Sequence, residues 1–112
     1  MKYLVELDHP KSGVPLSDEA ARAFFEGVIL PTVARAEQLV QDGHILAGGA
    51  VAGRIALRFI AEAETPAQLD QLIASLPVWT IAETRVTPLV DFSERRANMQ
   101  MFVQRFASPP DR

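Results

Sequence analysis

Cysteine is absent from the 112 residues of this chain, and histidine occurs only twice, at His9 and His44. The lack of cysteine excludes disulfides, thiolate metal sites and cysteine nucleophiles, and it fits a reducing compartment. The two histidines are far apart in the sequence, and no carboxylates stand at a spacing typical of metal ligands, so we expect no metal site. No glycine-rich phosphate loop follows a predicted strand at the required spacing, which argues against a nucleotide-binding protein.

Basic charge and long hydrophobic runs are also scarce. The net charge of −3 leaves no basic footprint, so we expect no nucleic acid partner. No apolar run approaches the roughly 20 residues that span a bilayer, and we expect no membrane association. The first eight residues contain no apolar core of the length typical of a signal peptide, which predicts a cytoplasmic protein.

The first half of the chain predicts a strand, a long helix and a hairpin. Alternation of Tyr3, Val5 and Leu7 favours a strand over residues 2–8. Ser17 is a good N-cap for a helix that runs to residue 42, with Gly43 as its C′ residue and a kink or break expected at residues 28–31, before and at a proline. Strands at 44–51 and 54–61 follow, joined by the turn at 52–53. The pair at 48–49 predicts a bulge or a close backbone approach.

The second half predicts a helix, a strand and a terminal helix. Thr65 and Pro66 are typical of a helix start, and Pro77 ends that helix after residue 76. A last strand is expected over residues 80–90, with Pro88 indicating an edge or a bulge. Ser93 is expected to cap a helix over 94–106, followed by a frayed tail at 108–112.

This order predicts an α+β fold, the ferredoxin-like βαββαβ arrangement, with an extra C-terminal helix. We expect one domain over residues 1–92, to which the helix and tail at 93–112 belong. Both internal helices would cover one sheet face and leave about 400 Å² of the other face open. Pairing two such faces would gain on the order of 20 kcal/mol against an association cost of about 4–15 kcal/mol, so we expect a homodimer or a higher homo-oligomer. The alternative is a monomer whose terminal helix covers the face.

A family resemblance rests on the segment from Gly43 through the Ala52-Gly53 turn to the run 76–79, Leu-Pro-Val-Trp. The chain resembles the muconolactone δ-isomerase family over residues 1–92, and the motif at 43–49 is similar, more weakly, to YciI-like proteins. The resemblance implies a dimeric α/β barrel, often assembled into a decamer. It also implies a cofactor-independent shift of a C=C bond in a small lactone, a reaction of aromatic compound catabolism. The family tends to carry a basic residue where this chain has Glu6.

Such a reaction needs a base beside a carbonyl and a cation or hydrogen-bond donor for the enolate. Glu6 and Arg58, on neighbouring strands of the predicted sheet, are the catalytic candidates; the alternative is a structural cross-strand ion pair. Further candidates for ligand binding are Asp8, His9, His44, Arg54, Trp79 and Glu83. The sequence therefore predicts an isomerase-like enzyme with a small-molecule ligand. A non-catalytic binding or accessory protein on the same barrel is the alternative, favoured by the apolar stretch 45–51.

Overall fold

The structure is a computed structural model that describes residues 1–10 and 15–107. The strands are β1 (Lys2–Asp8), β2 (Ile45–Ala50), β3 (Ala56–Glu62) and β4 (Glu83–Leu89). The helices are α1 (Asp18–Phe24), α2 (Leu30–Gln41), α3 (Pro66–Ala74) and α4 (Phe92–Ala107). A π-helical turn η1 (Phe25–Ile29) joins α1 to α2, and a 3₁₀ turn η2 (Pro77–Ile81) precedes β4. The four strands form one antiparallel sheet in the order β2-β3-β1-β4, which confirms the α+β, ferredoxin-like prediction.

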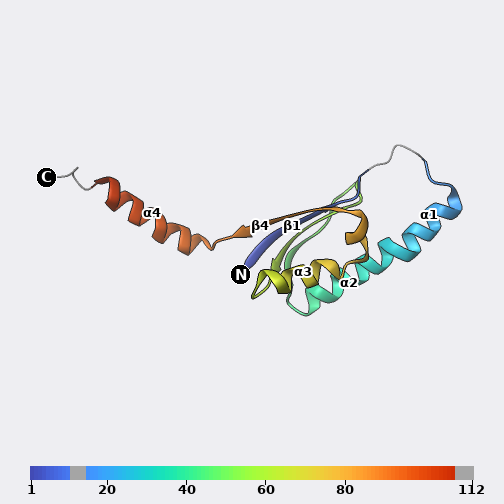
Figure 1. Ribbon diagram of the computed structural model, residues 1–112, viewed down its shortest axis with the longest axis horizontal. Helices are drawn as coiled ribbons and strands as arrows, with labels where there is room; N and C mark the ends of the chain where they lie inside the picture. Colours follow the sequence, from blue (N-terminus) through green and yellow to red (C-terminus); the bar gives the residue numbers. More distant parts are fainter. Residues whose placement is uncertain (11–14, 108–112) are drawn as a thin grey trace.

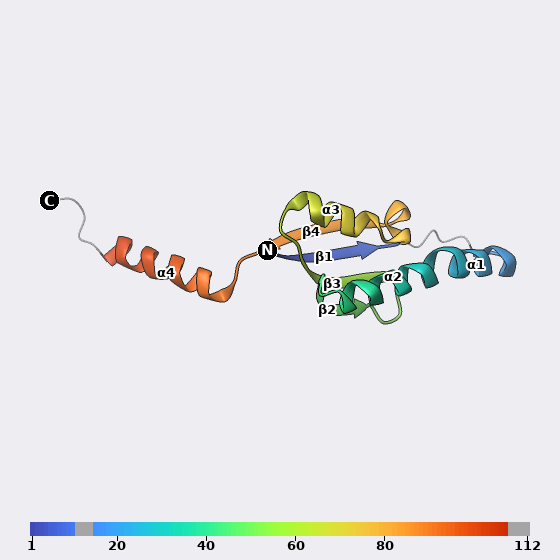
Figure 2. The ribbon, with the colours of Figure 1, turned by 90° about the horizontal axis from the view of Figure 1, so that it is seen from below.

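The core lies between one sheet face and the helices α2 and α3, both of which cover that face (Figure 1, Figure 2). The predicted alternation along β1 holds, because Tyr3, Val5 and Leu7 are each at most 3% exposed. They pack with Leu39 of α2 and with apolar side chains of α3. Burial of this alternating set fixes the register of β1, since a slip of one residue would turn the whole set to the open face.

The predicted interruption of the long helix is present as η1. The Leu30 N–H bonds to the Phe25 carbonyl, five residues back, in place of the usual four. Pro31 follows at once and lacks the N–H that would continue the regular pattern. The helix begins as predicted, because the Ser17 hydroxyl accepts a 3.1 Å hydrogen bond from the Ala20 N–H. It ends at Gln41 with Asp42 as C-cap, and the next residue, Gly43, has a φ of +82° that suits a C′ glycine.

Four predicted boundaries were wrong by two residues or more. Helix α3 ends at Ala74, with Ser75 as its C-cap, two residues before the expected end at 76. The third strand begins at Ala56, two residues later than expected. Residues 80 and 81 belong to η2, because the proline at 77 starts a tight turn whose N–H groups bond three residues back; the last strand starts at Glu83. The terminal helix begins at Phe92, so Ser93 lies inside its first turn, and the Asp91 carbonyl accepts from the Arg95 N–H.

The proline and glycine predictions for the sheet hold in modified form. Pro88 lies on β4, which is an edge strand. The pairing of β2 with β3 shifts between Ile45 and Ala47, so the irregularity precedes the glycine pair. The close backbone approach is at Gly48, with φ of +118° and the Arg58 carbonyl beside it.

Helix α4 does not cover the open sheet face. It extends away from the sheet beyond the end of β4 (Figure 1), and every one of its residues is exposed. The molecule is accordingly elongated, with principal extents of 76 × 33 × 23 Å. The alternative of a monomer covered by its own terminal helix is therefore wrong. The expected frayed tail at 108–112 lies outside the described residues.

The open sheet face is less apolar than predicted. A central row of Thr87, Leu4, Ile60 and Ala47 crosses the four strands, and the next row toward the end of β1 carries Arg85, Glu6 and Arg58. Half of this face is therefore charged, and the hydrophobic gain from pairing two such faces is smaller than estimated from the strand dimensions alone. In the described part of the chain, no helix has the length and apolar character that crossing a membrane requires.

Candidate functional site

An apolar cavity of about 110 Å³ lies at the end of the sheet where β1 stops. Side chains reach it from the end of β1, from the turn between β2 and β3, from η1 with the start of α2, and from η2. The apolar lining comes from Leu7, Ile29, Val33, Ala50, Ile55, Ala56, Leu57, Val78 and Ala82, and the polar lining from His9, Thr32 and Arg54. Apolar walls with a few convergent polar groups are typical of a small-molecule site.

His9 is held firmly in the wall of this cavity. Its backbone N–H donates a 3.0 Å hydrogen bond to the Ile55 carbonyl. Its ring Nδ1 lies 3.2 Å from the Ile81 carbonyl, and the ring packs against Phe24 at 5.2 Å between centroids. A carbonyl only accepts, so this contact places a proton on Nδ1 and leaves Nε2 as the basic nitrogen of the neutral ring.

Arg54 belongs to a chain of charges that links the cavity to the open sheet face. Asp8 accepts hydrogen bonds from Arg54 Nη2 and, at 3.0 Å, from Arg58 Nη2. Arg58 Nε lies 3.3 Å from Glu6 Oε1. The predicted contact of Glu6 with Arg58 across the ladder is thus confirmed, and Asp8 extends it to the cavity wall.

The Arg58 guanidinium is largely occupied by these contacts. Its Nη1 also donates to the Leu57 carbonyl at 2.9 Å. The side chains of Glu6, Asp8 and Arg58 are 24%, 30% and 32% exposed. Pairs this exposed contribute about 0–1 kcal/mol each to stability, so the network positions side chains more than it stabilises the fold.

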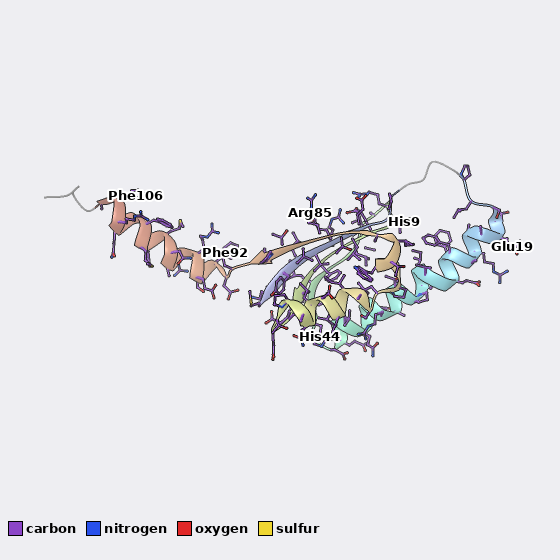
Figure 3. The ribbon with its side chains drawn as sticks, viewed as in Figure 1. His9, Glu19, His44, Arg85, Phe92 and Phe106 are labelled. Atoms are coloured by element: carbon purple, nitrogen blue, oxygen red, sulfur yellow. The ribbon has the colours of Figure 1, made fainter. Side chains whose placement is uncertain are left out.

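A second, polar depression lies on the open sheet face. It is lined by Glu6, Asp8, Arg58, Glu83, Thr84 and Arg85 and has a volume of about 250 Å³. Glu83 stands opposite Asp8 in the ladder, where two like charges repel. The two guanidiniums on Asp8 offset that repulsion. Glu6 and Arg58 therefore line this depression, whereas His9 lines the apolar cavity. Arg85, which also lines the depression, lies on the side of the sheet away from α2 and α3 (Figure 3).

Two of the predicted ligand-binding residues lie elsewhere. His44 follows the C-terminal glycine of α2 at the opposite end of the sheet, where its carbonyl accepts from the Glu62 N–H at 2.8 Å. Its own N–H bonds to the Leu39 carbonyl and closes the helix end. Trp79 lies in η2 and is 40% exposed, while its neighbour Val78 enters the cavity wall.

Sequence reasoning missed Thr32, the one buried polar residue in the described core. Its hydroxyl donates to the Val28 carbonyl at 2.7 Å and accepts from the Val78 N–H at 3.0 Å, which ties η2 to the helix across the cavity. The signal available was a threonine inside a predicted helix, because its hydroxyl can bond the carbonyl four residues back. Among the described residues, no group of three or more His, Asp or Glu side chains could hold a metal ion.

Comparison with known proteins assigns the family. The family model described as muconolactone delta-isomerase matches residues 1–95. The chain belongs to the muconolactone delta-isomerase family. That match spans the whole sheet, the cavity and the charge network, and it ends in the first turn of α4, so most of this helix lies beyond the family's match.

A solved structure shows the same fold. The crystal structure of muconolactone isomerase at 3.3 Å resolution superposes with a TM-score of 0.65 at 18% identity, covering 81% of this chain and 90% of the other. At that identity the likeness establishes the fold alone. A comparison with proteins of curated function gives no significant match.

Proposed function

We propose that this member of the muconolactone delta-isomerase family catalyses cofactor-independent isomerisation of a small lactone or carbonyl compound. The observation that carries the proposal is the meeting of an imidazole and a guanidinium, His9 and Arg54, at the wall of one apolar cavity. The cavity's size suits a compact substrate, because drug-sized ligands occupy sites of about 300–1,000 Å³.

The proposed reaction moves one proton within the substrate. His9 Nε2 removes a proton from a carbon activated by the carbonyl, and the electron pair shifts to the carbonyl oxygen as an enolate. Arg54 stabilises that oxyanion, and the imidazolium returns the proton to the far end of the conjugated system, which moves the double bond. The hydrogen bond of Nδ1 to the Ile81 carbonyl holds the ring orientation throughout.

Asp8 has a positioning role in this scheme. Its carboxylate binds both Arg54 and Arg58, and it fixes the position of the Arg54 guanidinium beside the cavity. Arg54 is 58% exposed even with this contact, and the contact lowers the side-chain entropy that the guanidinium would lose on binding a substrate.

A second assignment for the same reaction makes Glu6 the base and Arg58 the oxyanion stabiliser. It is supported by their contact and by the polar depression that they line. Against it, the nitrogens of Arg58 already contact Glu6, Asp8 and a backbone carbonyl. The depression would also exclude water only after another chain had covered the open face.

The test is a deuterium-exchange and turnover assay with a panel of small unsaturated lactones, muconolactone included. In D₂O, NMR detects loss of the acidic C–H, and ultraviolet absorbance detects movement of the double bond. We expect His9→Gln to lower kcat by about 10²–10⁴-fold and Arg54→Met to impair turnover. Glu6→Gln, the matched variant of the other assignment, should stay near wild type.

The outcomes separate the assignments. Loss of turnover in Glu6→Gln with an active His9→Gln would place the chemistry on the open face. Binding of lactones without exchange or turnover by the wild-type protein would indicate the alternative, a small-ligand binding or accessory protein.

A further inference from the structure

Helix α4 exposes an apolar stripe that no other described helix or strand of the chain covers. Phe92, Met99 and Phe106 recur every seven residues and Phe102 follows three after Met99, so all four lie on one side of the helix. Phe92 is 92% exposed and Phe106 is 78% exposed. A helix of 16 residues is only marginally stable alone in water, so this one needs a surface to pack against.

A complementary apolar groove lies between α2 and the edge strand β2. Its walls include Val33, Ala36 and Val40 of α2 and Phe59 of β3, with Glu37 among them. Val33 is 41% exposed and Val40 is 55% exposed. Glycines at 48 and 49 form the β2 wall and allow close approach, because neither carries a side chain.

Topology prevents α4 from reaching the groove of its own chain in this arrangement. The helix leaves the sheet from β4, and the groove borders β2, at the opposite edge of the order β2-β3-β1-β4. Figure 2 shows α4 directed away from the whole sheet. The occupant must therefore come from another molecule.

Charge distinguishes two candidate partners for α4 in a second copy: the α4 helix of that copy, called its arm, and residues 1–91, called its body. Residues 92–107 carry three arginines and one glutamate, whereas residues 1–91 carry seven basic and twelve acidic side chains. Two such arms repel each other, while an arm and a body attract. On the helix, Arg95 lies among the residues of the stripe and Arg96 lies beside it, and Glu37 lies in the groove.

We propose that α4 of one copy docks in the groove between α2 and β2 of a second copy. The contact pairs two helices along apolar stripes, which is the usual way that amphipathic helices bury such faces. Reciprocal docking closes a symmetric dimer, and one-way docking builds larger rings or chains. This inference does not depend on the proposed catalytic function.

The absence of cysteine permits a clean crosslinking test on the full chain. One version carries V40C in the groove, and a second version, with a tag of different mass, carries F102C on the stripe. Mixed and oxidised, they should form a V40C–F102C heterodimer, because a disulfide requires Cα atoms within about 7 Å. The matched control carries M101C in place of F102C. Residue 101 lies on the opposite side of α4, so the yield of adduct with V40C should be much lower.

Each outcome decides the proposal. A V40C–F102C adduct that exceeds both the M101C control and the F102C–F102C adduct supports it. Predominant F102C–F102C adducts would show that arms pair with arms, and equal yields with M101C would show random collision; either result overturns the proposal. Far-UV circular dichroism checks that each variant is folded, and M99C replaces F102C if that variant is not.

Discussion

Gly48→Ala should destabilise the protein more than any other single methyl addition in the sheet. A Cβ at this position would lie 2.2 Å from the Arg58 carbonyl oxygen and 2.5 Å from the Phe59 Cα, both backbone atoms that cannot rotate away. The φ of +118° adds strain for any residue with a side chain. Backbone strain of this kind costs about 1–3 kcal/mol, and relieving the overlap costs about 1–3 kcal/mol more.

We therefore expect a loss of about 3 kcal/mol or more in the free energy of unfolding. Gly49→Ala is the matched control, because a Cβ there meets nothing within 4 Å, and its effect should stay within about 0.5 kcal/mol. Urea denaturation at equal protein concentration, followed by circular dichroism and by the single tryptophan, measures both. If the two variants unfold at the same urea concentration, β2 does not approach β3 as described, and the bulge before Gly48 is misplaced.

Two other predictions concern the buried Thr32 of α2 and the open face of the sheet. Thr32→Val keeps the shape of the side chain but leaves the buried Val78 N–H without its acceptor, so the free energy of unfolding should fall by about 1–3 kcal/mol. Thr32→Ser keeps the hydroxyl and should stay closer to wild type. Thermal or urea denaturation measures both variants, and equal stability would show that the hydroxyl does not link η2 to the helix. Ile60 lies in the central row of the open sheet face, so Ile60→Lys would bury an unpaired charge if two sheets pair face to face. Sedimentation should then detect smaller species, and an unchanged size would exclude that interface.

The site could be anticipated only in part from the sequence. Glu6 and Arg58 were expected to meet because period-two alternation and the ferredoxin-like strand order place them on one face of neighbouring strands. Asp8 and His9, adjacent in sequence, point to opposite sides of the sheet end, which alternation also predicts. One of the two partners of Asp8, however, is Arg54, which lies 46 residues away in a turn, and no local sequence pattern indicates where a turn directs a long side chain.

What the sequence determined by itself is the set of elements and their order. Alternation at Tyr3, Val5 and Leu7 predicted β1. Ser17 and Gly43 predicted the two ends of the long helix, and Pro31 predicted its interruption. These signals are local, because they depend on backbone conformations and hydrogen bonds between residues a few positions apart.

Only the tertiary structure decided which polar side chains come together at one cavity. The cavity exists because η1, η2 and two strand ends close around it, and its polar groups come from residues 9, 32 and 54. The direction of α4, away from the sheet rather than across it, was equally beyond sequence patterns. Both depend on how separate elements pack and on the path of the chain between them, which side-chain periodicity within one element does not encode.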